Sequence, residues 1–287
     1  MKPAPFAYHR PGDLADALDR LTELNAHGEE VKVLAGGQSL IPMMNFRLAR
    51  PSHLVDIGRL REHAGIRFDG SGLRIGALTT HHEVELARLP EGFDMLNRAM
   101  RWIGHLPIRT RGTVGGSLVH GDATAEWCLL ALILDARIVA VSPTGRREIL
   151  AEDMFHGFYE TEAAPEEIVT EIILPAPAPH AALTEFAQRR GDFAIVGVAV
   201  RLDVDPSGVL RGARVALGGV DPAPVRSASA EAVLTGGVPA GALFAACAEA
   251  AAADISPPDD VHGSSEYRRR LTRALVEAAC TQAWGNA

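Results

Sequence analysis

The chain has 287 residues, 47% of them hydrophobic, and a formal net charge of −8. This length can bury a full hydrophobic core and favours two or three domains over one. The acidic balance argues against nucleic acid or an anionic membrane as the main partner, because both attract a basic surface. No apolar run can span a bilayer and the first residues lack the apolar stretch of a signal peptide, so we expect a cytoplasmic protein without stable membrane insertion.

Cysteine and lysine are scarce. Cys128, Cys247 and Cys280 are too few and too widely spaced for a disulfide framework, a zinc site or a cysteine-ligated iron-sulfur cluster. The two lysines, Lys2 and Lys32, leave every glycine-rich turn without a P-loop lysine and give a Schiff-base mechanism almost no candidate. Any electron carrier is therefore organic or lies on another chain.

The first part of the chain predicts short alternating helices and strands. Asp13 caps an amphipathic helix that starts at Leu14, and residues 31–34 form a strand. In chain order there follow a helix at 39–46, a strand at 53–57, a hairpin at 65–68 and 73–76, a helix from about 80 to 88, a helix at about 93–103, a loop at 109–117, an apolar helix at 124–134, and strands at 137–141 and 147–150.

A domain boundary is expected where a strand at 168–174 ends at Pro175, because residues 176–179 have a linker's composition. Beyond it we predict strands at 184–188, 194–204 and 210–217 and helices at 228–234, 241–252 and 265–283. This order indicates an α+β domain with an antiparallel meander and helices on one face. The domains are then 1–176 and 177–287.

Two glycine-hydroxyl turns are the most informative motifs. The first is Ala35-Gly36-Gly37-Gln38-Ser39-Leu40, after a strand and at the start of a helix; the second is Thr113-Val114-Gly115-Gly116-Ser117. Backbone N–H groups that no β-carbon shields, next to a hydroxyl, suit a phosphate or pyrophosphate. Neither turn has the Rossmann or Walker spacing, so the pair predicts a dinucleotide held between two loops of another kind.

Polar residues elsewhere give weaker signals. Asp122 and Glu126 lie at the start of the apolar helix. In one interpretation Asp122 caps the helix and Glu126 interacts favourably with the helix dipole; in the other, Glu126 accepts hydrogen bonds from ribose or ribityl hydroxyls. His81 and His82 point in different directions on a helix and have no third ligand at helical spacing, so we predict no metal site. No residue is a specific candidate for acid-base or nucleophilic catalysis.

Four segments in order resemble the FAD-binding medium subunit of the molybdenum hydroxylases, whose members include carbon monoxide, xanthine, nicotine and quinoline dehydrogenases. The segments are 35–57 (AGGQSLIPMM, then Arg47, Pro51 and LVDI), 75–81 (IGALTTH), 108–117 (IRTRGTVGGS) and 191–194 (GDFA). The resemblance runs over essentially the whole chain. It implies an α+β protein: two α/β subdomains of the vanillyl-alcohol-oxidase type, about 1–58 and 59–176, that grip FAD, and a C-terminal domain with a three-stranded antiparallel sheet and a helical bundle.

The resemblance also implies roles for single positions. The segments Ala35 to Leu40 and Thr113 to Ser117 would bind the diphosphate and ribityl parts of FAD, and Glu126 stands where the family has an acidic contact. Apolar positions that line the cofactor correspond to Ile103, Ile168 and Val169, and Phe193 stands where an aromatic residue lies near the isoalloxazine ring.

The partners follow from the same resemblance. A large subunit with the molybdopterin cofactor oxidises the substrate, a small subunit with two [2Fe-2S] clusters relays electrons, and this chain's FAD delivers them to an acceptor, in a dimer of heterotrimers. A free-standing flavin oxidase of the vanillyl-alcohol-oxidase type is the alternative, and a nucleotide-binding assembly or regulatory subunit without redox activity is a third. The 5% aromatic content argues against an aromatic-rich substrate domain and hence against the oxidase.

Overall fold

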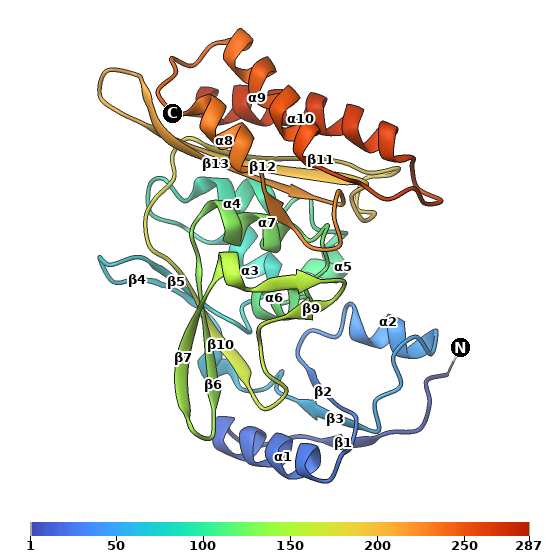
Figure 1. Cartoon of the computed structure of the whole chain (residues 1–287). Coiled ribbons are helices and arrows are strands. Elements are labelled where there is room, and N and C mark those ends of the chain that lie inside the picture. The colour runs from blue at the N-terminus through green and yellow to red at the C-terminus, as the bar shows by residue number, and fades with distance from the viewer. Residues whose placement is uncertain (1, 287) are drawn as a thin grey trace.

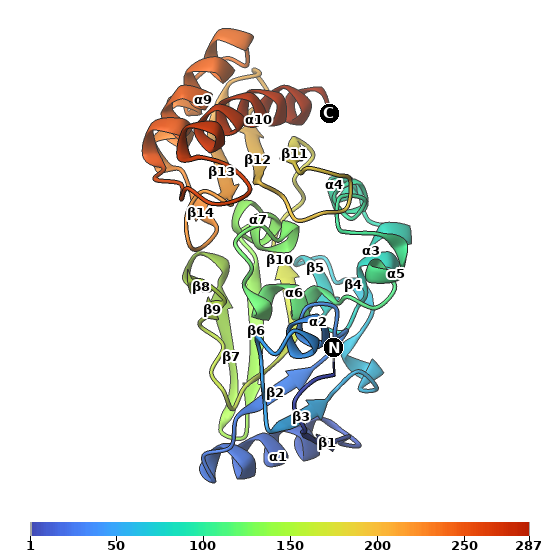
Figure 2. The ribbon, with the colours of Figure 1, turned by 90° about the vertical axis from the view of Figure 1, so that its right-hand side faces the viewer.

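The computed structural model describes residues 2–286. The chain runs from a small N-terminal sheet, through a larger mixed middle layer, to a C-terminal sheet covered by three helices (Figure 1). Turning the molecule by 90° shows the same stacking, with the N-terminal sheet and its helix at one end of an elongated body and the C-terminal helices at the other (Figure 2). The order of the layers therefore follows the order of the chain.

The N-terminal sheet is parallel and has the strand order β1-β3-β2. Its elements are β1 (Ala7–His9), α1 (Leu14–Ala26), β2 (Val31–Leu34), α2 (Leu40–Asn45) and β3 (His53–Asp56). Asp13 caps α1 by accepting a hydrogen bond from the backbone N–H of Asp16 at 2.9 Å, as the sequence predicts. The buried face of α1 packs Leu18 and Leu21 in one cluster with Val55 of β3. Strand β2 lies at the edge of the sheet and leads into the first glycine segment.

The middle layer holds a five-stranded antiparallel sheet of order β4-β5-β10-β6-β7. Its strands are β4 (Ile66–Phe68), β5 (Leu73–Gly76), β6 (Arg137–Ser142), β7 (Gly145–Leu150) and β10 (Ile168–Leu174), with a small pair, β8 (Phe155–Gly157) and β9 (Glu160–Thr161). Its helices are α3 (His81–Leu86), α4 (Asp94–Ala99), α5 (Leu106–Arg109), α6 (Val114–His120) and α7 (Glu126–Ile133), with short 3-10 turns at Arg61–His63 and Ala151–Asp153. Central strand β10 pairs with both β5 and β6, which the five helices α3 to α7 separate in the sequence.

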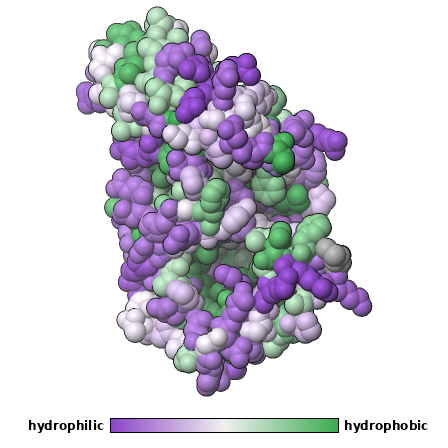
Figure 3. Space-filling model, turned by 45° about the vertical axis from the view of Figure 1, so that its right-hand side comes forward, coloured by the Kyte–Doolittle hydropathy of each residue, from purple (hydrophilic) through white to green (hydrophobic). Residues whose placement is uncertain are grey.

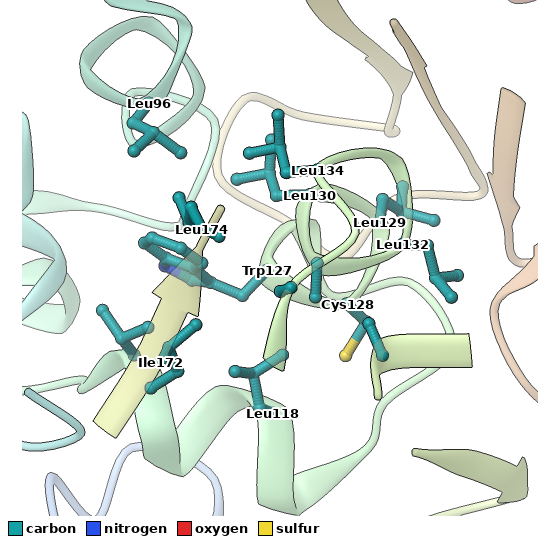
Figure 4. Packing of buried hydrophobic residues seen from close by; sticks show 14 of the residues in the cluster. Leu96, Leu118, Trp127, Cys128, Leu129, Leu130, Leu132, Leu134, Ile172 and Leu174 are labelled. Atoms are coloured by element: carbon teal, nitrogen blue, oxygen red, sulfur yellow. The ribbon is translucent and has the colours of Figure 1, made fainter. Parts of the chain in front are cut away.

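Helix α7 is buried on every side, which explains its uniformly apolar sequence. It lies between the middle layer and the C-terminal sheet, and Trp127 packs beside Ile172 and Leu174 of β10 in the same cluster (Figure 4). The cluster continues into Ala199 and Ala216 of the C-terminal sheet. One hydrophobic core therefore joins the last two layers.

The C-terminal layer is an antiparallel sheet of order β11-β12-β13-β14. Its elements are β11 (Ala181–Phe186), β12 (Val196–Val204), β13 (Leu210–Gly218), β14 (Val225–Arg226), α8 (Ala228–Leu234), α9 (Gly241–Asp254) and α10 (Ser265–Gly285). The helices cover the face away from α7 (Figure 1). The α+β class is confirmed, and the three predicted strands are joined by β14, a fourth strand of two residues.

The largest local difference from the predicted elements lies between residues 93 and 121. The helix predicted at 93–103 stops at Ala99, and turns lead to Gly104, whose φ of +48° is a left-handed conformation that favours glycine. The predicted loop at 109–117 is partly helical, because α6 begins at Val114. The second glycine pair therefore lies inside the first turn of a helix.

Candidate functional site

The first glycine segment offers a row of free backbone donors. The N–H groups of residues 35 to 40, from Ala35 to Leu40, donate to no acceptor within residues 2–286. Gly37 takes a φ of +73°, which lets the chain turn from β2 into α2 and keeps this row partly exposed. Ser39 stands at the N-cap of α2 without a capping hydrogen bond, so its hydroxyl is free as well. The donor chemistry matches a diphosphate.

The second glycine segment differs, because its N–H groups are already used. The donors of Val114 and Gly115 bond the carbonyl oxygens of Thr79 (3.0 Å) and Ala77 (2.9 Å). The N–H of Gly116 bonds the Thr113 hydroxyl at 3.1 Å, and that of Ser117 bonds the Thr113 carbonyl at 3.0 Å. The expectation of two equivalent donor clusters is therefore wrong: from Val114 to Ser117 the backbone donors are used, and the Ser117 hydroxyl is the polar group that this stretch offers.

The two segments touch each other. A β-carbon at Gly36 would lie 2.1 Å from the carbonyl oxygen of Arg111, and one at Gly116 would lie 3.8 Å from the β-carbon of Ala35. Glycine is thus required at position 36 because two backbones approach each other there. From the sequence we expected a ligand, and not the protein backbone, to approach this glycine. The free donors of the first segment and the start of α6 consequently lie side by side.

A buried histidine braces the second segment from behind. His81 is 5% exposed, and its Nδ1 accepts a hydrogen bond from Trp127 Nε1 at 3.1 Å. Burial, with a smaller contribution from Arg109, lowers the pKa of His81 to about 4, so the ring is neutral at pH 7. The backbone N–H of His81 donates a hydrogen bond to the Gly112 carbonyl oxygen at 3.0 Å. A β-carbon at Gly112 would lie 2.8 Å from the imidazole ring. The histidine therefore has a packing role beside Gly112.

The acidic residue at the start of α7 has a perturbed environment. Burial, followed by the charge of Asp122, raises the pKa of Glu126 to about 7. Asp122 does not cap α7: its carboxylate accepts from the N–H and hydroxyl of Thr124, both at 2.8 Å, and Ala125 occupies the N-cap. Strand β11 adds a second carboxyl, Glu185, whose pKa is raised to about 9 by burial and by Glu126. Sequence patterns did not predict this pair, because the two carboxyl groups come close only through tertiary packing.

The remaining predicted residues lie at the junctions between layers. Ile103, Ile168 and Val169 are buried, and Ile168 and Val169 belong to different clusters because successive strand residues face opposite sides. Phe193 is 76% exposed on the segment between β11 and β12. A β-carbon at Gly191 in that segment would lie 2.6 Å from the His105 ring, so the segments that carry Phe193 and Ile103 are neighbours.

The face shown in Figure 3 is hollowed between the N-terminal part and the middle of the molecule, and hydrophobic residues lie in the hollow. Within residues 2–286, no group of three or more His, Cys, Asp or Glu side chains is arranged to hold a metal ion. The three cysteines are buried and unpaired. No helix in the same range is long and apolar enough to cross a membrane.

Comparison with known proteins shows which family this chain belongs to. The family model described as "FAD binding domain in molybdopterin dehydrogenase" matches residues 4–177, and "CO dehydrogenase flavoprotein C-terminal domain" matches residues 181–283. The chain belongs to this family of FAD-binding proteins. The predicted resemblance to the medium subunits of molybdenum hydroxylases is thereby confirmed, as are the oxidoreductase class and FAD as the cofactor of this chain.

Individual relatives match over nearly their whole length. The chain is 38% identical to the 6-hydroxypseudooxynicotine dehydrogenase complex subunit alpha of Paenarthrobacter nicotinovorans, covering 99% of this chain and 96% of that protein. It is 34% identical to the carbon monoxide dehydrogenase medium chain of Hydrogenophaga pseudoflava, covering 99% of each. The solved carbon monoxide dehydrogenase of that organism superposes with a TM-score of 0.95 and 34% identity over all of both chains. Quinoline 2-oxidoreductase from Pseudomonas putida 86 gives 0.92 and 33%, covering 100% of this chain and 99% of that chain.

Proposed function

We propose that the chain holds one FAD where the two glycine segments meet and serves as the electron-delivery subunit of a molybdenum hydroxylase. The observation that carries the proposal is the row of six N–H groups, Ala35 to Leu40, that have no acceptor within residues 2–286 and lie next to Gly116. A row of backbone donors suits the two negative charges of a diphosphate, which no lysine of a P-loop neutralises here.

Each part of the site then has a physical task. The N–H row grips the diphosphate, and the hydroxyls of Ser39 and Ser117 add donors at its two sides. Ile103, Ile168 and Val169 keep water from the flavin, and Phe193 lies near the ring. Glu126, with a pKa near 7, takes a hydrogen bond from the ribityl chain when ionised. Bound FAD supplies an acceptor for single electrons that passes on one or two.

The proposal extends to partners and place. The relatives are named as medium chains or subunits of dehydrogenases, which supports a large molybdopterin subunit and a small subunit with two [2Fe-2S] clusters as partners of this chain. We infer a dimer of such heterotrimers in the cytoplasm. The chain would divide into an FAD-binding domain, 1–176, with subdomains of about 1–58 and 59–176, and a C-terminal domain, 177–287. The three larger sheets, which each lie within one of these ranges, support this division.

The experiment is to purify the native complex and to measure flavin, iron and molybdenum together with the masses of its chains. We expect all three in one assembly with two further subunits. A homogeneous flavoprotein without iron or molybdenum chains, whose flavin is bleached by an organic substrate, would instead establish the free-standing oxidase. A chain that purifies without flavin and takes up none would establish the regulatory alternative.

A further inference from the structure

A cavity of about 480 Å³ opens between α4 and β11, which lie side by side in Figure 2. The residues that line it and matter for its chemistry are Arg98, Arg101, Trp102, Phe186, Arg189 and Arg190. None of the residues proposed to bind FAD lines it. The volume is in the range typical of small-molecule sites, roughly 300–1,000 Å³.

The four arginines of this cavity have no partners. Within residues 2–286, no carboxylate or carbonyl group pairs with the guanidinium of Arg98, Arg101, Arg189 or Arg190, whereas Arg147 of the middle layer bonds two glutamates. All four arginines are exposed and line the same cavity, so like charges gather there although the chain as a whole is acidic. Guanidinium groups bind phosphate in pairs of parallel hydrogen bonds, so an anion with several phosphate oxygens would balance these charges.

The one carboxyl group on the wall does not neutralise the arginines. Glu185 lines the cavity, and burial together with the charge of Glu126 raises its pKa to about 9. The Glu185 carboxyl is therefore protonated at pH 7 and can donate a hydrogen bond. The cavity keeps its positive charge in the neutral pH range.

Two aromatic side chains give the cavity flat apolar surfaces. Trp102 and Phe186 are 37% and 40% exposed, and Tyr267 holds the Phe186 ring edge-on with 6.4 Å between the centroids. Aromatic and guanidinium planes are the surfaces on which nucleobases stack. We propose that this cavity is a nucleotide site, with the phosphates on the arginines and the base against Trp102. Arginines alone would equally suit an acidic protein surface, but the concave shape and the aromatic walls favour a small molecule.

The site is testable in the full-length chain saturated with FAD. ADP, pyrophosphate and adenosine are titrated separately by calorimetry at fixed ionic strength. We expect saturable binding of ADP at one site. The double variants Arg98→Gln/Arg101→Gln and Arg189→Gln/Arg190→Gln should each weaken both ADP and pyrophosphate at least tenfold. Trp102→Leu should weaken ADP about tenfold and leave pyrophosphate unchanged, because only ADP carries a base.

The matched control is Arg211→Gln, an exposed arginine near the β12–β13 turn, which should bind ADP as the unchanged chain does. Absence of ADP binding to the FAD-saturated chain would overturn the proposal, as would equal ADP affinity in Trp102→Leu, the result expected of a general polyanion surface. Loss of FAD from the arginine variants would also overturn it, by assigning the cavity to the FAD site. Flavin absorbance is recorded throughout, so a failure of FAD binding itself is seen separately.

Discussion

The two glycine segments resemble each other in sequence and differ in what their backbones do. Between Ala35 and Leu40 the N–H groups have no acceptor within residues 2–286, whereas the N–H groups from Val114 to Ser117 are all bonded to the protein. The first segment leaves a sheet edge, where the next strand is missing and donors stay free. The second begins a helix that is anchored on the residues after β5.

This difference teaches that a glycine pair beside a hydroxyl has two separate uses. In the first segment glycine turns the chain and exposes donors. In the second it permits close packing, since a β-carbon at Gly115 would lie 2.5 Å from the β-carbon of Ala77. The proposed site thus consists of one set of free donors, Ala35 to Leu40, and one rigid wall, the start of α6, and substitutions can separate the two contributions.

The strongest way to break the arrangement is Gly36→Ala. Its β-carbon would meet the backbone of Arg111 at 2.1 Å, and no side chain can rotate away to make room. We expect the two segments to separate, with loss of FAD and a decrease of about 3 kcal/mol in the free energy of unfolding, at the upper end for overpacking. Flavin content after gel filtration and chemical denaturation measure both. Gly12→Ala, where a β-carbon meets nothing within 4 Å, is the control and should retain FAD.

Acid should weaken the rigid wall through His81. Its folded pKa of about 4 is below the ordinary 6.5, so the unfolded chain binds more protons between these values. Stability is therefore full above pH 6.5 and falls as the pH drops toward 4, by up to about 3 kcal/mol from this residue. His81→Leu should lose this part of the pH dependence and should also be less stable at pH 7, because the Trp127 N–H loses its acceptor.

The comparison that checks this is denaturation at pH 7 and pH 4.5 of the unchanged chain, His81→Leu and His27→Leu. His27 is exposed and should behave like the unchanged chain. An identical pH dependence in His81→Leu would show that the acid sensitivity arises elsewhere, for example at His9 or His120, whose pKa values burial also lowers.

The carboxyl pair Glu126 and Glu185 should give stability the opposite pH dependence. The pKa values of Glu126 and Glu185 are raised to about 7 and about 9, so the folded chain holds more protons than the unfolded chain above pH 4.5. The pair therefore costs stability as the pH rises through this window. Glu185→Gln should raise the free energy of unfolding at pH 8 by about 1–2 kcal/mol, and by less at pH 5. Equal effects at both pH values would contradict the pairing.

Periodicity predicted much of the architecture because most elements obey local rules. Strands β2 and β10 and helix α8 have the predicted bounds, because alternation, apolar runs and helix caps depend only on residues that are close in the sequence. The two-residue strands β9 and β14 were not predicted, because they are defined only by their pairing with β8 and β13. In the candidate site, the role of the glycine pairs in binding FAD stays a prediction. The contact of Gly36 with Arg111 and the approach of Glu185 to Glu126 could not be predicted, because they depend on tertiary packing.

The smallest expected effects concern the hydroxyl groups of Thr113 and Ser39, which should differ in what they stabilise. Thr113 caps α6 through the 3.1 Å bond from Gly116, so Thr113→Ala should cost about 1 kcal/mol of stability even without FAD. Ser39 makes no capping bond, so Ser39→Ala should leave the stability of the FAD-free chain unchanged and should weaken FAD about tenfold by removing one donor to a charged group. Thermal denaturation of the FAD-free proteins and flavin titration give the two readings. A stability loss in Ser39→Ala equal to that in Thr113→Ala would mean that the first segment is braced like the second, and the proposed division into free donors and rigid wall would fail.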